Sequence, residues 1–202
     1  AYDGLDRLIE AQSAIFGGDG IHRFEYDAVD NLMHWTLGGV KDYARYVYGA
    51  DNRLARIEGT GGGTLHTFGH DVQGNVTDKD STDYHFDIGN RLRAVVAPTV
   101  TETYRYDGHG RRVLAWTSAG SKLSMYSATG QIIYQQLFSA TQNKAIDYIT
   151  LSGSLVANRE VPLGGGTAVV KYQHTDALGS PVAVTDGTGA VIERTDYDPY
   201  GG

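Results

Sequence analysis

The chain has 202 residues, with 24 acidic and 17 basic side chains and a net charge of −7. This charge argues against nucleic acid or an anionic membrane surface as a partner. Apolar runs are only a few residues long, so no membrane insertion is predicted, and the absence of cysteine excludes disulfides and thiol chemistry. Residues 1–6 show no signal peptide, lack an initiator Met and begin inside a repeat, so we expect a fragment of a longer protein.

An aromatic residue followed by aspartate recurs about every 20 residues. The pattern continues with two or three variable residues, then Gly, Asp or Asn, then Arg or Asn, then an aliphatic residue. A period of this length is typical of a chain built from one supersecondary unit that buries its apolar face only against its neighbours. The copies start at Tyr2, Tyr26, Tyr48, His70, Phe86, Tyr106 and Tyr126.

Strands are predicted along the whole chain. Residues 5–15 have some helical spacing, but they occupy the place of a strand in the repeat and are predicted to form one. Residues 24–27, 46–49 and 84–87 each carry two aromatic residues that are two positions apart, and therefore on one face of a strand. Cross-strand pairs of such aromatics are expected to stabilise the stack.

The repeat unit is clearest in residues 101–117, where Tyr104 and Tyr106 are expected on one strand face. The segment Asp107 to Gly110 follows, and it is dense in turn formers. Asp accepts hydrogen bonds from backbone N–H groups two residues on, and Gly supplies positive φ. Each aromatic-Asp pair is therefore predicted to end a strand and open a hairpin turn, in which the tyrosine packs and the aspartate caps.

These elements predict an all-β fold of stacked antiparallel β-hairpins, forming a spiral wall or part of a hollow β-shell. The strands alternate polar and apolar residues, whereas a helix-covered parallel sheet would be continuously apolar. The runs Gly61–Gly63 and Gly164–Gly166 are predicted to be loops, because neither has the Lys-Ser/Thr ending of a phosphate loop.

The Tyr-Asp copies resemble the YD-repeat, or Rhs, family, which includes bacterial Rhs polymorphic toxins, the C component of Tc insecticidal toxin complexes and animal teneurins. The repeat residues that carry the resemblance are Tyr2, Asp3, Tyr26, Asp27, Tyr48, Phe86, Asp87, Tyr106, Asp107 and Tyr126. A more specific match is an ordered C-terminal run similar to the family's Rhs-associated core, which has H-x-D-x-L-G-S-P, T-D-x-x-G and Y-D-P-Y-G elements. Its residues are His174, Asp176, Leu178, Gly179, Ser180, Pro181, Asp186, Gly189, Tyr197, Asp198, Pro199, Tyr200 and Gly201.

The resemblance implies a YD-repeat array over residues 1–173 and a core-like segment over residues 174–202 that is continuous with the same shell. In toxin members the shell encloses a C-terminal effector, so the expected function is containment or presentation of such an effector by a secreted or cell-surface protein. The effector segment of the parent is the expected partner, and no cofactor is expected. We expect no enzymatic activity, apart from aspartate-dependent self-cleavage in the full-length parent, whose cleavage region is missing from this chain.

Two carboxylates that share one proton could serve peptide-bond chemistry, because like charges at close range split their pKa values. The best candidates for such self-cleavage are Asp186 and Asp198, with Asp176 and Asp196 behind them. Asp186 precedes Gly187, and Asp198 precedes Pro199, so both also fit as turn residues.

Metal sites are not predicted. His66 and His70 have helical zinc spacing beside Asp71, but four residues of a strand place them about 13 Å apart. The acidic segment 78–83 hints at a calcium loop, but it lacks the required Gly and Glu and is predicted to be a polar turn.

Exposed aromatic residues leave an alternative function open, namely an extracellular adhesion module that binds a cell-surface glycan or protein. The conceivable platforms are Tyr43, Tyr46 and Tyr48, or Trp35 and Trp116, although packed cross-strand aromatics explain them as well. Open strand edges at the ends of a partial spiral also predict weak self-association.

Overall fold

The computed structural model describes residues 1–199, so Tyr200 and Gly201 of the core motif lie outside the described residues. The chain forms two compact units. Unit 1 consists of residues 1–84 together with the C-terminal segment that begins at Tyr197, and unit 2 consists of residues 85–196. Among the described residues, no helix has the length and apolar character that crossing a membrane requires.

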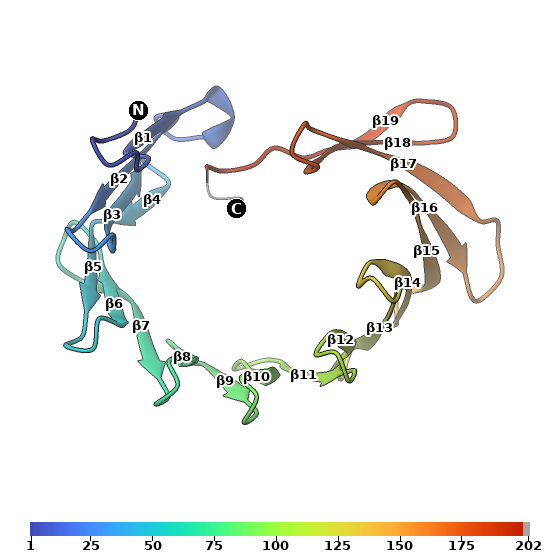
Figure 1. The fold of residues 1–202 in the computed structure, drawn as a ribbon, viewed down its shortest axis with the longest axis horizontal. Coiled ribbons are helices and arrows are strands. Elements are labelled where there is room, and N and C mark those ends of the chain that lie inside the picture. Colours follow the sequence, from blue (N-terminus) through green and yellow to red (C-terminus); the bar gives the residue numbers. More distant parts are fainter. Residues whose placement is uncertain (200–202) are drawn as a thin grey trace. The chain divides into compact units, whose positions relative to one another are not determined.

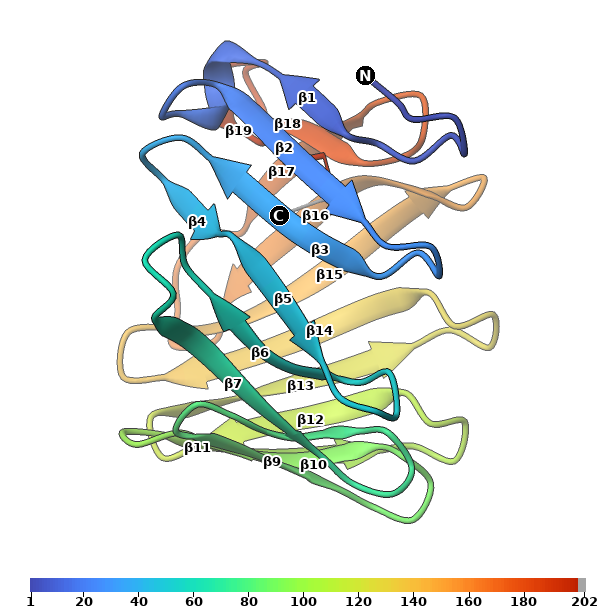
Figure 2. The same cartoon turned by 90° about the vertical axis from the view of Figure 1, so that its left-hand side faces the viewer.

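Unit 1 begins with a four-stranded antiparallel sheet in the order β1-β2-β3-β4. Its strands are β1 (Glu10–Gln12), β2 (Ile21–Tyr26), β3 (Leu32–Leu37) and β4 (Lys41–Tyr43). Figure 2 shows β2 and β3 side by side, joined by a turn. The strands that follow along the chain are β5 (Arg45–Tyr48), β6 (Leu54–Glu58), β7 (Thr64–His70), β8 (Val76–Lys79) and β9 (Thr82–Phe86), which runs into unit 2.

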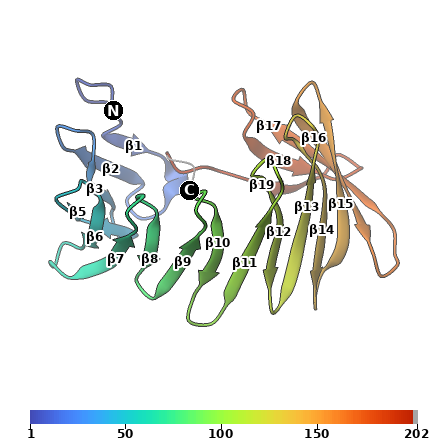
Figure 3. The same ribbon diagram turned by 60° about the horizontal axis from the view of Figure 1, so that its bottom comes forward.

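Unit 2 continues the same alternation of strands and short turns (Figure 1). Figure 3 shows strands β11 to β15 side by side in chain order. In the hydrogen-bond order of the sheet, β5 to β19 follow one another as fifteen strands, and the order does not close on itself. The strands of unit 2 are β10 (Leu92–Val96), β11 (Thr101–Tyr106), β12 (Arg112–Thr117), β13 (Gly120–Tyr126), β14 (Ile132–Ser139), β15 (Asn143–Leu151), β16 (Ser154–Pro162), β17 (Val169–Thr175), β18 (Pro181–Thr185) and β19 (Val191–Arg194).

This architecture confirms the predicted all-β stack of antiparallel hairpins. The two glycine runs lie between strands as predicted, the first between β6 and β7 and the second between β16 and β17. Strand β17 runs through residue 173, and the structure does not test the predicted boundary there. Residues 148–155, which match the repeat only weakly, form a tight hairpin that turns at Ser152 and Gly153.

The predicted strand over residues 5–15 is only partly formed, and the prediction is wrong at both ends of this range. Pairing is confined to a bridge at Leu8 and to β1, and Ala14–Phe16 form a short 3₁₀ helix. The Ser13 side chain accepts a hydrogen bond from the Ile15 N–H, which caps this turn and draws the chain away from the extended conformation. The apolar residues at the end of this segment therefore belong to a helical turn and not to a longer strand.

The core is thin, because the sheet is a single layer in which few side chains are fully enclosed. In unit 1 the buried hydrophobic residues are Phe24, Leu37, Tyr46 and Ile57. In unit 2 they are Tyr104, Ala115, Ala145, Ile146, Ala157 and Val184. Three of these six are alanines, so burial of apolar surface contributes little per residue, and hydrogen bonding within and between the turns must carry much of the order.

The two faces of the sheet in unit 2 differ in chemistry. Residues that pair across neighbouring strands share a face of the sheet. Ser121 pairs with Trp116 on one side and with Phe138 on the other, so these two aromatic residues lie on the same face. We call this the apolar face, and its exposed apolar members are Trp116, Leu123, Met125, Phe138, Ile149 and Tyr172. The same face also carries the ion pair between Asp147 and Arg159 at 3.1 Å. The opposite face carries charged side chains, including the ion pairs that Glu160 makes with Lys144 at 2.8 Å and with Lys171 at 2.7 Å.

A glycine pair in one turn tests the backbone requirement of the fold. Gly110 has a φ of 77°, whereas Gly108 has no positive φ, and an added Cβ would meet nothing within 4 Å at either position. We expect Gly110→Ala to lower the free energy of unfolding by about 1–2 kcal/mol, the cost of a left-handed conformation for an L-residue. Gly108→Ala is the matched control and should stay within about 0.5 kcal/mol in urea unfolding. Equal effects of the two changes would contradict this account of the turn.

Candidate functional site

The repeat motif forms a turn whose aspartate satisfies the backbone of the whole loop. In the turn after β11, Asp107 Oδ1 accepts hydrogen bonds from the backbone N–H groups of His109 and Arg111, both at 2.9 Å. The Asp107 N–H donates to the Arg111 carbonyl at 3.0 Å, and the Gly110 N–H donates to the Asp107 carbonyl at 3.1 Å. One carboxylate oxygen thus holds two donors that would otherwise need water.

The same bonds recur wherever the motif carries aspartate. In each case Oδ1 accepts from the backbone N–H groups two and four positions later, at 2.8–3.1 Å. We call these residues the turn aspartates, and they are Asp3, Asp27, Asp71, Asp87, Asp107, Asp176 and Asp186.

The two C-terminal turn aspartates explain most of the core motif. Asp176 and Asp186 open turns whose fourth residues, Gly179 and Gly189, have φ values of 88° and 85°. Pro181 then begins β18, and His174 Nε2 lies 3.0 Å from the Thr185 hydroxyl. The core motif therefore continues the repeat with two further turns, which sequence comparison among the seven N-terminal copies had not shown. Leu178 is 92% exposed, and nothing in the structure explains its presence.

The second carboxylate oxygen positions the residue four places after the aspartate. Arg7 Nε donates to Asp3 Oδ2 at 2.7 Å, and Arg111 Nε donates to Asp107 Oδ2 at the same distance. Asn31 makes the corresponding bond to Asp27 at 2.8 Å. Because these Asp–Arg pairs are about one-fifth exposed, each guanidinium is held in a fixed orientation rather than swinging freely in water.

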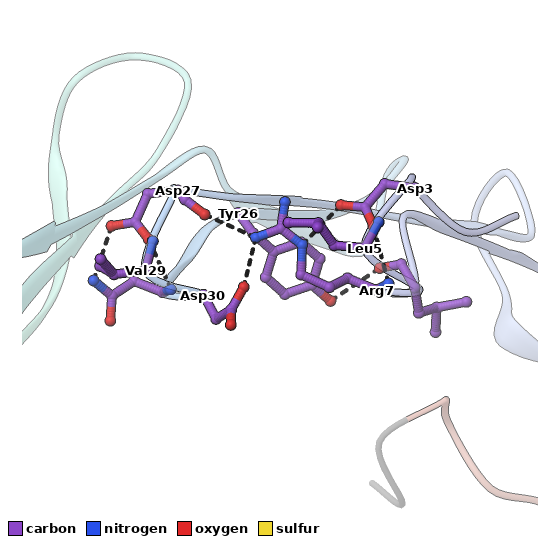
Figure 4. A network of polar contacts seen from close by, with 9 residues as sticks. Asp3, Leu5, Arg7, Tyr26, Asp27, Val29 and Asp30 are labelled. Carbon is purple, nitrogen blue, oxygen red and sulfur yellow. Dashed lines mark hydrogen bonds and ion pairs between the residues drawn. The ribbon is translucent and has the colours of Figure 1, made fainter.

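In the turns of Asp3 and Asp107 the arginine held in this way reaches the next turn along the chain. Arg7 Nη1 donates to the Asp27 carbonyl and to Asp30 Oδ1, both at 2.8 Å (Figure 4). Arg111 Nη1 donates to the Ser127 carbonyl at 2.8 Å. Other forward bonds of this kind run from Asn31 to Asn52, from Arg53 to Asp71 and from Gln131 to Gly153.

The tyrosine of the motif reaches in the opposite direction. Tyr26 Oη donates to the Leu8 carbonyl at 2.9 Å, and Tyr106 Oη donates to the Leu92 carbonyl at 2.6 Å. Four places after the aspartate of the preceding turn stands an Arg or Asn. Each accepting carbonyl belongs to the residue directly after it. Equivalent bonds join Tyr48 to Leu32 and Tyr126 to Arg112. Arginine also stacks over the tyrosine of the next turn, with Arg7 5.0 Å from the Tyr26 ring and Arg111 5.2 Å from the Tyr126 ring.

Sequence reasoning predicted that Asp caps and Tyr packs, and the capping is confirmed. It missed the bonds between turns. The signal was present, because a tyrosine, rather than a phenylalanine, opens five of the seven copies, and its hydroxyl needs a partner where the ring is half-buried.

Hydrogen bonds within the turns lower the pKa of six turn aspartates, which are Asp3, Asp27, Asp71, Asp87, Asp107 and Asp186. For Asp107 the largest cause is the backbone N–H of Arg111, and for Asp27 it is the side-chain amide of Asn31. The pKa of Asp186 is lowered first by the Thr188 hydroxyl. These carboxylates stay ionised at neutral pH, as hydrogen-bond acceptors require.

The candidate self-cleavage aspartates have different surroundings. Asp186 belongs to unit 2, where Oδ1 accepts from the Thr188 N–H, the Thr188 hydroxyl and the Ala190 N–H. Asp198 belongs to unit 1, where Oδ1 lies 3.5 Å from Nε2 of the buried His22. The bonds of Asp186 match those of the other turn aspartates, and a catalytic function of either residue stays a prediction.

His66 does not meet His70 in a metal site. Its Nδ1 lies 2.8 Å from Asp80 Oδ2, and its Nε2 lies 3.1 Å from the Tyr43 hydroxyl. Within residues 1–199, no three His, Cys, Asp or Glu side chains gather where they could hold a metal ion.

Most of the aromatic residues considered as binding platforms are engaged in the sheet of unit 1. The Trp35 ring contacts Phe24 at 5.6 Å and Tyr43 at 6.3 Å, and Tyr43 contacts the buried Tyr46 at 6.1 Å. These are cross-strand aromatic contacts of the predicted kind, joined by His22. Trp116, in contrast, is 50% exposed on the apolar face of unit 2.

A sheet of short hairpins whose Asp turns are bonded to one another defines a structural YD-repeat wall. The family model for the teneurin YD-shell matches residues 1–202, and the chain belongs to this family. It is 25% identical to teneurin-3 of Mus musculus and 26% identical to teneurin-1 of Homo sapiens, in each case over 99% of this chain and 8% of the relative. The chain thus spans less than a tenth of the curated relatives it matches.

The fold is also similar to that in the crystal structure of TcdB2-TccC3-Cdc42, with a TM-score of 0.50 and 15% identity. The similarity covers 100% of this chain and 13% of that one. At this level of identity the likeness concerns the fold alone.

Removing one tyrosine hydroxyl tests the bonds between turns. We expect Tyr106→Phe to lower the free energy of unfolding by about 1 kcal/mol, because the Leu92 carbonyl loses its donor while the ring still packs. Tyr172→Phe is the matched control, since Tyr172 is 45% exposed and no bond of its hydroxyl is among those the structure describes. Urea unfolding of both variants measures the difference, and a Tyr106→Phe protein as stable as the control would argue that the bond contributes nothing.

Acid should weaken the folded state through the turn aspartates. A carboxylate whose folded pKa is lowered stabilises the fold above its ordinary pKa, 3.8 for Asp, and this contribution is lost as pH falls through the lowered value. We therefore expect the urea midpoint to fall between about pH 5 and pH 3. In the double variant Asp3→Asn and Asp107→Asn the midpoint should be lower at pH 6 and should depend less on pH. An unchanged pH dependence would show that these two carboxylates are not linked to folding.

Proposed function

We propose that this chain is a wall segment of a shell that contains or presents a C-terminal effector of its parent protein. The observation that carries the proposal is the single-layer sheet itself. Its turns are bonded to their neighbours, so the wall is ordered without a thick core, and one face of unit 2 is left apolar and exposed.

The apolar face is chemically suited to an extended or unfolded segment. Phe138 is 57% exposed and Met125 is 52% exposed, so the sheet gains little from them and an apolar chain laid on them would bury additional surface. The opposite face, with its ion pairs around Glu160, is suited to water. The ordered core motif supports a C-terminal effector as the contained segment, because in toxin relatives of this kind the effector follows the core.

The same proposal includes an extracellular or cell-surface location for the parent protein. The membership of the teneurin YD-shell family supports this location.

Protection of the effector tests containment. When this chain is expressed together with the segment that follows it in the parent, added protease should digest that segment more slowly than the segment alone. Phe138→Ser should make the digestion roughly tenfold faster, corresponding to about 1.4 kcal/mol of lost contact, without lowering the urea midpoint.

The matched control is Lys122→Ser, which removes an exposed side chain from the opposite face of the neighbouring strand and should leave protection unchanged. Equal digestion of the free and co-expressed segment would contradict containment. Equal effects of the two substitutions would show that the apolar face does not hold the segment.

Recognition of a cell-surface glycan or protein remains the second candidate, and the half-exposed Trp116 favours it. Binding on a glycan array that is lost in Trp116→Ala would support it, and the absence of binding to any glycan would exclude the glycan version. Weak self-association through the terminal strands β5 and β19 remains a prediction of the open strand order.

A further inference from the structure

The first sheet of unit 1 contains a histidine that is buried more completely than any of its neighbours in the aromatic cluster. His22, on β2, is 1% exposed. The Phe16 ring meets it edge-on at 4.7 Å, and the Phe24 ring stacks at 6.0 Å. Such enclosure is costly for a polar ring unless both of its nitrogens have partners.

Within residues 1–199, only Nδ1 of the two His22 nitrogens has a hydrogen-bond partner. Trp35 Nε1 donates to His22 Nδ1 at 2.9 Å. An indole N–H is always a donor, so His22 Nδ1 must carry a lone pair and the ring proton must sit on Nε2. Trp35 thereby selects the tautomer of His22 and leaves a buried Nε2–H donor with no hydrogen bond inside the sheet.

That donor faces the C-terminal segment. Asp198 Oδ1 lies 3.5 Å from His22 Nε2, and Asp198 is itself one-third exposed. The chain leaves unit 1 after Tyr84 and returns to it at Tyr197, so the contact joins segments that are far apart in sequence. At 3.5 Å the carboxylate oxygen lies next to the buried donor, slightly beyond the length of an ordinary hydrogen bond.

A cation lies over the Trp35 ring that sets the His22 tautomer. Lys41 Nζ lies 3.3 Å from the centre of the Trp35 ring. Burial lowers the pKa of Lys41, while the Asp198 charge acts in the opposite direction. Trp35 is therefore shared between His22, through its N–H, and Lys41, through its face, and both partners favour a negative charge at the position that Asp198 occupies.

We propose that the β1–β4 sheet carries a docking site for the chain's own Tyr197–Pro199 segment, in which the His22 Nε2–H meets the Asp198 carboxylate and the positive charge of Lys41 favours that carboxylate there. This proposal rests on the proposed function, because it supplies the point at which a contained C-terminal segment is anchored to the wall. His22 contacts the segment directly, Lys41 contributes its charge, and Trp35 is a positioning residue that acts through the His22 tautomer.

Imidazole NMR of the ¹⁵N-labelled chain tests the docking site without any downstream segment. His22 should give the signals of a neutral ring protonated at Nε2. Asp198→Ala should shift the His22 Nε2–H signal and leave the urea midpoint unchanged, because the substitution lies outside the sheet. Asp196→Ala, which removes a carboxylate two residues away, is the matched control and should leave the His22 signals in place. Unshifted His22 signals in Asp198→Ala, or equal shifts in both variants, would overturn the proposal.

Trp35→Phe tests the positioning function. It keeps a ring for Lys41 but removes the N–H, so His22 should populate the Nδ1–H tautomer and the effect of Asp198→Ala on the Nε2 signal should shrink by at least half. A His22 ring that stays fully in the Nε2–H form would show that Trp35 does not set the tautomer. If Trp35→Phe does not fold, Lys41→Met offers a second measurement, because it should shift the Asp198 carboxylate signal and a null result would remove Lys41 from the site.

The outcomes separate this inference from containment. If NMR shows the segment docked in the chain alone while the co-expressed effector is not protected from protease, the docking site is supported and containment is contradicted. A protected effector combined with unshifted His22 signals would do the opposite.

Discussion

The carboxylate of the turn aspartate is the constraint on which the rest of the wall depends. With Oδ1 it satisfies two backbone N–H groups of its own turn, and in the turns that carry arginine its Oδ2 fixes the guanidinium. The fixed guanidinium then bonds the next turn, and the tyrosine of that turn bonds back to the carbonyl that follows the arginine. Tyr, Asp and Arg therefore form one hydrogen-bond network that links adjacent turns. Loss of the aspartate would release a turn and, in the same step, the link to its neighbour.

This hydrogen-bond network explains how a sheet with so few buried side chains can be ordered. Alanines make up half of the buried hydrophobic residues of unit 2, and several exposed aromatic and aliphatic side chains lie on one face. In a compact domain those side chains would form the core. In a wall they remain available, while polar links between turns supply order that a thicker core would otherwise provide.

The sequence predicts the hairpins and their turns because the responsible interactions are local. Asp107 and Gly110 are three residues apart, and turn chemistry acts within five residues. The contacts that were missed join residues further apart. Tyr106 and Leu92 are separated by 14 positions, and no local propensity encodes that bond. The site at His22 is harder still, because Asp198 reaches it only after the chain has passed through all of unit 2. The 3₁₀ turn at Ala14–Phe16 was misjudged since the repeat pattern was extended over a segment where Ser13 offers a competing cap.

The central claim is that adjacent turns are coupled through the Arg and Tyr side chains. A double-mutant cycle on Arg111 and Tyr126 measures this coupling directly, with Arg111→Met and Tyr126→Phe as the single changes. The account predicts an interaction energy of at least about 0.5 kcal/mol in urea unfolding, and additive behaviour for the control cycle of Arg111→Met with Tyr172→Phe. Additivity in both cycles would contradict it, because the turns would then be stable independently and the repeat motif would act only within each hairpin.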